Sequence, residues 1–199
     1  MKHKNIFVAC DTSNLSEIKK IIKQTQSNKL KIDPKFGLQF FYSKNGRKFL
    51  ENFNKDFWLD LKINDIPQTA LSALDSLKDL KKCKYITVHA NGGLEMLRVI
   101  KKKAKSINKD LKVLGVTILT SLNNKSLEEI GHTKSVKQLV LKQAGLIKKS
   151  GCDGIVCSAQ EAKMVRKKFK NLFIITPGIR LPGDSANDQS RIMTPNDAF

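Results

Sequence analysis

The sequence predicts an α/β protein of the (β/α)8 TIM-barrel class, and two observations support this prediction. Short apolar runs rich in β-branched residues alternate along the chain with longer amphipathic, lysine-rich stretches, as repeated βα units around a parallel sheet do. Charged and polar residues follow the apolar runs, and a barrel carries its chemistry at these carboxyl ends of its strands. Strands separated by helices throughout the chain fit such a barrel better than an open sheet.

The expected strands are the apolar runs, and the expected helices are the amphipathic stretches between them. In chain order, the strands are expected near 6–11 (IFVACD), 30–38 (LKIDPKFGL), 56–61 (DFWLDL), 84–89 (KYITVH), 111–118 (LKVLGVTI), 154–158 (GIVCS) and 172–176 (LFIIT). The helices are expected near 14–27, 43–53, 68–81, 92–106, 135–150 and 160–170. Ser13, Ser43 and Ser135 stand near three helix starts, where a serine side chain can cap the helix.

The composition is that of one globular domain, residues 1–199, without a membrane-spanning segment. Of the 199 residues, 40% are hydrophobic and 28% are charged, and no apolar run approaches the roughly 20 residues that span a bilayer. Cys10, Cys83, Cys152 and Cys157 form no CxxC pair and have no histidine at zinc-binding spacing, so we expect reduced, structural thiols. We therefore expect a cytoplasmic protein without a metal site.

The formal net charge of +19 raises the question of nucleic-acid binding. Lysine supplies nearly all of the basic residues, and many lysines fall on the expected outer faces of helices. We find no RNA-binding signature and no helix-turn-helix pattern, so a lysine-rich solvated surface is the favoured interpretation and no nucleic-acid partner is expected. A non-enzymatic basic binding protein remains an alternative, and salt-dependent affinity for bulk RNA would support it.

The segment from Phe57 to Thr69 is the most informative in the chain. Residues i and i+2 of an extended strand share a face, so Asp60 and Lys62 point the same way. Asp65 follows in the loop that ends the strand. A lysine between two carboxylates is held as the ammonium form and can donate a proton. The alternative is a strand end followed by ordinary solvated charges.

This segment resembles the signature of the orotidine 5'-phosphate decarboxylase family, which reads aspartate, x, lysine, x, x, aspartate, isoleucine, proline, x, threonine. Every fixed position from Asp60 to Thr69 is matched. The resemblance implies a carboxy-lyase that converts orotidine 5'-phosphate to UMP and CO2, the last step of de novo pyrimidine synthesis. It also implies a homodimer that uses neither a metal ion nor an organic cofactor.

The resemblance assigns roles to the charged residues. Asp60 would face the carboxylate of the substrate, and Lys62 would stabilise charge at C6 and deliver the proton. Lys35 and Asp65 would keep Lys62 charged and oriented. Asp65 and Thr69 would reach across the dimer interface to serve the site of the partner.

Other segments match the same family in the same order, although each also has a purely structural interpretation as a turn, cap or edge residue. Asp11 would bind the ribose hydroxyls, Lys35 carries the second-strand motif KFGLQ, and His89 would support the site from behind. Thr120 would lie against the pyrimidine, while Arg180 and Gln189 would contact the phosphate. Ser158 and Glu161 are interpreted instead as a helix-capping box.

The sequence departs from the family pattern after Phe199, where the family has an eighth strand with a Gly-Arg phosphate ligand and a final helix. We therefore expect an incomplete, C-terminally truncated barrel, and an inactive fragment is one alternative. Another is a sugar-phosphate decarboxylase or aldol-type synthase of the same superfamily, since these enzymes share the Asp-x-Lys-x-x-Asp pattern. The Ile66-Pro67-x-Thr69 continuation favours the nucleotide enzyme over them.

Overall fold

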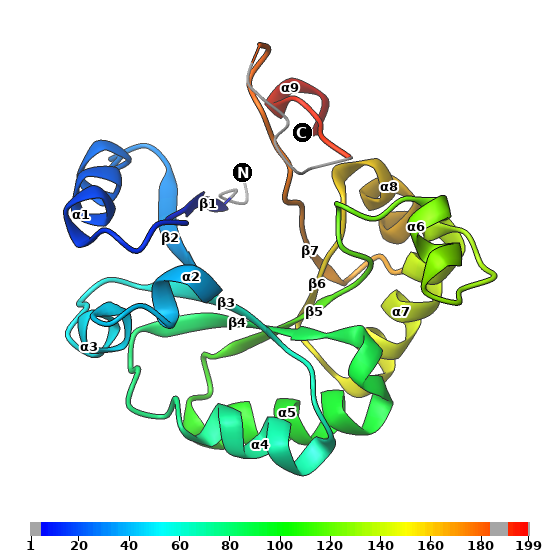
Figure 1. Ribbon diagram of the computed structural model, residues 1–199, viewed down its shortest axis with the longest axis horizontal. Helices are drawn as coiled ribbons and strands as arrows, with labels where there is room; N and C mark the ends of the chain where they lie inside the picture. The colour runs from blue at the N-terminus through cyan, green and yellow to red at the C-terminus, as the bar shows by residue number, and fades with distance from the viewer. Residues whose placement is uncertain (1–4, 184–190, 199) are drawn as a thin grey trace.

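The computed structural model describes residues 5–183 and 191–198, and in it seven parallel strands form one curled sheet with the order β1-β2-β3-β4-β5-β6-β7 (Figure 1). The strands are β1 (Asn5–Ala9), β2 (Lys31–Gly37), β3 (Phe57–Ile63), β4 (Cys83–His89), β5 (Lys112–Val116), β6 (Gly154–Val156) and β7 (Phe173–Ile175). Each strand pairs with the next one in sequence. The predicted α/β class is confirmed, and each predicted strand is present close to its expected position.

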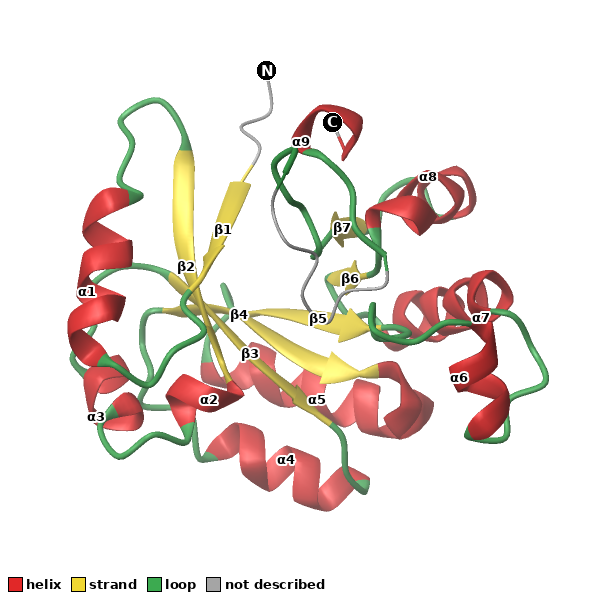
Figure 2. Cartoon of the chain, turned by 45° about the horizontal axis from the view of Figure 1, so that its top comes forward, coloured by secondary structure: helices red, strands yellow, loops and turns green. Residues whose placement is uncertain are grey.

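Most of the helices cover the outer, convex side of the sheet (Figure 2), whereas the last one lies by its open side near the C-terminus (Figure 1). The helices are α1 (Leu15–Gln24), α2 (Leu38–Phe41), α3 (Gly46–Glu51), α4 (Pro67–Asp75), the 3-10 turn η1 (Ala90–Gly92), α5 (Gly93–Ile107), α6 (Asn124–Glu129), α7 (Val136–Ser150), α8 (Ala159–Lys168) and α9 (Pro195–Ala198). The short helices α2 and α6 were not predicted, because a helix of one or two turns leaves too little apolar periodicity to read.

One of the three predicted helix caps is correct. Ser135 begins α7 with a complete capping box, in which its hydroxyl and the Gln138 side chain each bond the backbone of the other residue. The prediction for Ser13 is wrong because α1 starts one residue later, where the Asn14 side chain accepts from the amides of Ser16 and Glu17. The prediction for Ser43 is also wrong, since its hydroxyl donates to the carbonyl of Phe40.

Two apolar layers hold the sheet in its curled form. The larger layer lies between the sheet and the helices. The smaller one fills the inside of the curve, where Trp58, Leu114 and Val156 pack together with Phe7 and Tyr85 against them. The ring of Phe7 meets those of Trp58 and Tyr85 edge to face, with centroids 5.0 and 5.1 Å apart, an arrangement that adds to the stabilisation from burial.

The four cysteines are free and buried, as expected. Burial raises the pKa of the Cys83 thiol to about 12 and that of Cys152 to about 11, so both remain protonated at neutral pH. Across residues 5–183 and 191–198, no helix has the length and apolar character needed to cross a membrane.

We expect replacement of Gly115 by alanine to destabilise the fold by about 1–3 kcal/mol through overpacking. A Cβ atom at this position in β5 would collide with the side chain of Ile147 on α7. Ile147→Ala opens space at the same place, so the double variant should be more stable than the sum of the two single effects predicts. Urea unfolding of the three variants measures this coupling; strictly additive losses would contradict the close packing of α7 on β5.

Candidate active site

Three neighbouring strands bring four charged side chains into one row at the carboxyl end of the sheet. Lys35 lies 3.1 Å from Asp11, which follows β1, and 3.6 Å from Oδ2 of Asp60 in β3. The same oxygen of Asp60 lies 2.9 Å from Nζ of Lys62. Parallel pairing produces this row, since it aligns Ala9 with Lys35 and β2 with β3. The signs alternate along the row, so each inner charge has an opposite charge on both sides.

The glycine of the second-strand motif makes room for this row. A Cβ atom on Gly37 would lie only 3.0 Å from Oδ1 of Asp11, which is tighter than van der Waals contact allows. Pro34, an unusual residue for a central strand, is accommodated because the pairing of β2 with β3 begins at Lys35, one residue after it.

Lys62 reaches Asp60 through an irregular backbone. The prediction of a plain strand near 56–61 is incomplete, since β3 continues to Ile63 and bulges on the way. Leu59 pairs with Ile86 and Ile63 pairs with Val88, so three residues of β3 face one residue of β4. Lys62 has a φ of 50°, which costs an L-residue about 1–2 kcal/mol. Bulges of this kind re-aim side chains near functional sites.

Thr87 in β4 is the residue opposite this bulge, and sequence reasoning missed it. Its side chain is fully buried, its hydroxyl donates to Oδ1 of Asp60 over 2.8 Å, and it accepts from the backbone N–H of Lys62 over 2.9 Å. The available signal was its position two residues before His89, which places both residues on one face of the strand.

Asp65 and Thr69 lie away from the row. Asp65 is exposed, and its Oδ1 accepts from the backbone N–H of Ile66 over 2.7 Å. Within the described part of the chain no ion pair joins Asp65 to Lys62, so Asp60 is the carboxylate of the same chain that pairs with this lysine. Asn64 and Pro67 turn the chain too soon for the Asp65 carboxylate to fold back. Thr69 is exposed in the first turn of α4.

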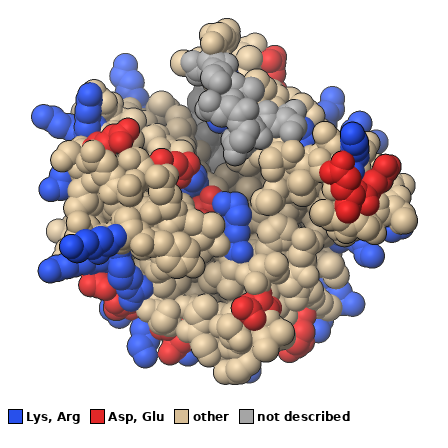
Figure 3. All heavy atoms as spheres, in the orientation of Figure 1, with Lys and Arg blue, Asp and Glu red and all other residues tan. Residues whose placement is uncertain are grey.

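Figure 3 shows acidic and basic side chains together near the middle of the face in view. The other Lys and Arg side chains visible in this view are spread around the rim. The side chain of Lys62 is 35% exposed and that of Asp60 only 11%. The ammonium group can therefore meet a ligand, while the carboxylate that pairs with it is largely shielded from water.

His89 ends β4 beside this row. Its Nδ1 accepts from the backbone N–H of Asn91, which fixes the neutral tautomer with the proton on Nε2. Burial first, and the charge of Lys62 second, lower the pKa of His89 below its ordinary value. The imidazole is thus neutral at pH 7 and adds no charge to the site.

The remaining predicted residues lie on the loops after β5 and β7. Thr120 is half-buried beyond Ile118. Arg180 is also half-buried, and its backbone N–H donates to the carbonyl of Met193, so the chain returns beside this strand end. Gln189 falls outside the described residues.

A buried ion pair that the sequence did not reveal connects the segment at Arg191 with helix α8, and the same arginine also bonds the loop after β5. Nη1 of Arg191 lies 2.7 Å from Oε1 of Glu161, and both residues are buried. Nη2 of Arg191 donates to the carbonyls of Ile118 and Leu119. The predicted capping box is therefore half right: Ser158 caps α8 through the N–H of Gln160, whereas the Glu161 carboxylate turns to Arg191, whose charge attracts it more strongly than a backbone amide.

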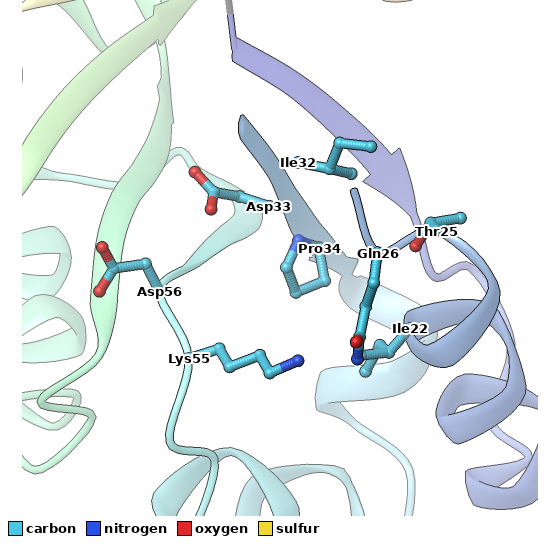
Figure 4. A pocket seen from close by; sticks show the side chains of 8 residues that line it. All are labelled: Ile22, Thr25, Gln26, Ile32, Asp33, Pro34, Lys55 and Asp56. Carbon is cyan, nitrogen blue, oxygen red and sulfur yellow. The ribbon is translucent and has the colours of Figure 1, made fainter. Parts of the chain in front are cut away.

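A cavity of about 120 Å³ lies away from the row, beside the first half of β2 (Figure 4). Lys55 extends into it, while the carboxylates of Asp33 and Asp56 point to the other side. Burial raises the pKa of Asp33, which lies 3.7 Å from the Lys31 ammonium. Among the described residues, no group of three or more His, Cys, Asp and Glu side chains could hold a metal ion.

Comparison with known proteins shows which family and which solved fold this chain resembles. The model of a family described as orotidine 5'-phosphate decarboxylase / HUMPS matches residues 4–199. An orotidine 5'-phosphate decarboxylase of Staphylococcus epidermidis is 41% identical, covering 82% of this chain and 73% of its own. One of Sphingopyxis alaskensis is 38% identical, covering 98% and 85%. The crystal structure of the Lactobacillus acidophilus enzyme superposes with a TM-score of 0.82 at 29% identity, over 98% of this chain and 85% of that one.

The left-handed backbone at Lys62 predicts that glycine stabilises the fold more than alanine at this position, the reverse of their usual order in regular secondary structure. Lys62→Gly should be more stable than Lys62→Ala by about 1 kcal/mol, because glycine adopts a positive φ without a steric penalty. Both variants lose the same ammonium group, so each serves as the control for the other. Urea unfolding at fixed pH gives the two free energies of unfolding. An alanine variant as stable as the glycine variant would show that position 62 carries no backbone strain.

Proposed function

The chain belongs to the orotidine 5'-phosphate decarboxylase / HUMPS family, and we propose from this that it converts orotidine 5'-phosphate to UMP and CO2. The observation that carries the proposal is the row in which the ammonium groups of Lys35 and Lys62 lie 3.6 and 2.9 Å from the same carboxylate oxygen of Asp60. Such a row places fixed charges beside the atoms where charge develops in the transition state. Stabilisation of that charge is usually the largest single contribution to enzymatic rate acceleration. The relatives' names favour this activity over the sugar-phosphate alternatives.

In this proposal Asp60 faces the carboxylate of the bound substrate. Two like charges in a shielded site repel each other, and loss of CO2 removes one of them. The low exposure of Asp60 supports this role, because water screens the repulsion poorly there. Lys35 and Thr87 hold Asp60 in place as the substrate approaches.

Lys62 supplies the opposite charge at the reacting carbon. When the bond between C6 and the carboxyl group breaks, its electron pair stays on C6 and CO2 leaves. The ammonium of Lys62 stabilises this negative charge and then transfers a proton to C6, giving UMP and a neutral amine that water reprotonates. Its partial exposure and its contact with Asp60 support this role.

In this proposal the ribose, the pyrimidine ring and the phosphate of the nucleotide contact residues on the neighbouring loops. Asp11 binds the ribose hydroxyls, Thr120 contacts the pyrimidine, and Arg180 with Gln189 binds the phosphate. His89 supports the site as a neutral group. Binding energy gained at the phosphate, far from C6, is available for orienting the base over Lys62. A cytoplasmic location belongs to the same proposal and fits the four free thiols.

We further propose that the enzyme is a homodimer in which Asp65 and Thr69 complete the site of the partner. Both side chains are exposed and lie apart from the charged row of their own chain. Ile66 between them is 68% exposed, and in this proposal the partner subunit covers its apolar side chain.

Spectroscopic assay of UMP formation from orotidine 5'-phosphate tests the activity. We expect turnover in the wild-type protein and a loss of at least about 1,000-fold in Lys62→Ala, since the variant lacks both the stabilising charge and the proton donor. Binding of UMP should persist, because the phosphate and ribose contacts remain. Turnover should also survive a chelator, since a lysine supplies the positive charge; loss with EDTA and recovery with magnesium would contradict the assignment.

Mixing two inactive variants tests the shared site. In a symmetric dimer, a hybrid of Lys62→Ala and Asp65→Ala has one site with both lesions and one with neither, so full exchange at equal amounts restores about one quarter of the wild-type sites. A Lys62→Ala and Asp60→Ala mixture is the control and should stay inactive, because each chain supplies its own row and every row keeps one lesion. Equal recovery in both mixtures, or none after verified exchange, would refute the interface.

A further inference from the structure

We propose that Thr87 is a positioning residue for the decarboxylation, and that its hydroxyl fixes both the Asp60 carboxylate and the backbone of Lys62. This inference rests on the proposed function, because it concerns how the same site is held in its working geometry. Thr87 touches neither the reacting carbon nor the carboxylate of the substrate in this proposal. It acts through the two groups that do.

The hydroxyl of Thr87 acts as donor in one of these contacts and as acceptor in the other. A threonine hydroxyl has one proton to give, and here it goes to Oδ1 of Asp60 over 2.8 Å. The oxygen accepts from the backbone N–H of Lys62 over 2.9 Å. The residue is 0% exposed, so water cannot replace either bond.

The two contacts act on different parts of the charged pair. One orients the carboxylate of Asp60, leaving its Oδ2 free to lie against Lys62 and Lys35. The other secures the N–H of Lys62 at the point where β3 bulges and this residue has a φ of 50°. A strained backbone conformation persists only where surrounding contacts hold it in place. Here the buried Thr87 hydroxyl holds the backbone of Lys62 through its N–H.

Regular strand pairing on both sides of β4 holds Thr87 in position. It pairs with Leu114 of β5, which belongs to the apolar layer inside the sheet. Its neighbours Ile86 and Val88 are the residues that resume pairing with β3 on either side of the bulge. The hydroxyl is thus anchored by regular β-structure on both sides and presented to the one irregular segment.

The test compares Thr87→Val with Thr87→Ser. Valine keeps the shape but removes the hydroxyl, so we expect kcat to fall about 10- to 100-fold, as small misplacements of reacting groups do. KM should change less than about 3-fold, because the ribose and phosphate contacts are untouched. Serine restores the hydroxyl and should return kcat to within about 3-fold of wild type. Hydrogen exchange of the Lys62 amide, followed by NMR, should be faster in the valine variant and near normal in the serine variant.

Thr117→Val is the matched control. Thr117 is equally buried, and its hydroxyl donates over 2.9 Å to the carbonyl of Val156, so it loses a comparable bond away from the charged row. We expect its kcat and its Lys62 exchange to stay near wild type. A similar fall in kcat for both valine variants, or unchanged kcat in Thr87→Val, would overturn this inference alone. A wild-type protein that forms no UMP would overturn the proposed function and this inference with it.

Discussion

The geometry of the site depends on one carboxylate. Oδ2 of Asp60 lies within 3.6 Å of two ammonium groups, Lys35 and Lys62, which would repel each other without the negative charge between them. Its other oxygen accepts from Thr87. These partners come from β2, β3 and β4, so the alignment of three strands converges on a single side chain. An alanine at position 60 would leave the two lysines to separate and would remove the partner of a buried hydroxyl.

The sequence predicted the strands well, because apolar runs alternate regularly with lysine-rich stretches, and resemblance identified the charged residues. What it could not supply are features made by contacts between distant residues. The bulge at Lys62 has no marker such as glycine. Thr87 is an ordinary strand former by composition. Arg191 and Glu161 are thirty positions apart, and only the folded chain pairs them. The loop position of Asp65 was correctly predicted, and its role across a dimer interface stays a prediction.

A cluster of phenylalanine rings packs on the side of β2 opposite the charged row. Phe36 lies in β2 between Lys35 and Gly37, on the opposite face, and its ring packs against Phe40, Phe57 and Phe53 with centroids 5.1 to 5.7 Å apart. This cluster stabilises β2 and β3 together, at the level where their polar sides carry charge. Strained, partly buried charges reduce stability, and proteins that keep them for function offset the loss by packing elsewhere.

The simple strand order has a consequence for how the protein is made. Every strand pairs with the one synthesised just before it, so most contacts of the sheet close over one βα unit rather than across the whole chain. Sequential pairing keeps the sequence separation of these contacts short for a parallel sheet, and it lets the sheet grow from its N-terminal edge while the ribosome is still translating. Asp11, Lys35, Asp60, Lys62 and Thr87 all precede the fifth strand. The charged row can therefore be complete in the nascent chain before the segments proposed to hold the base and the phosphate have emerged.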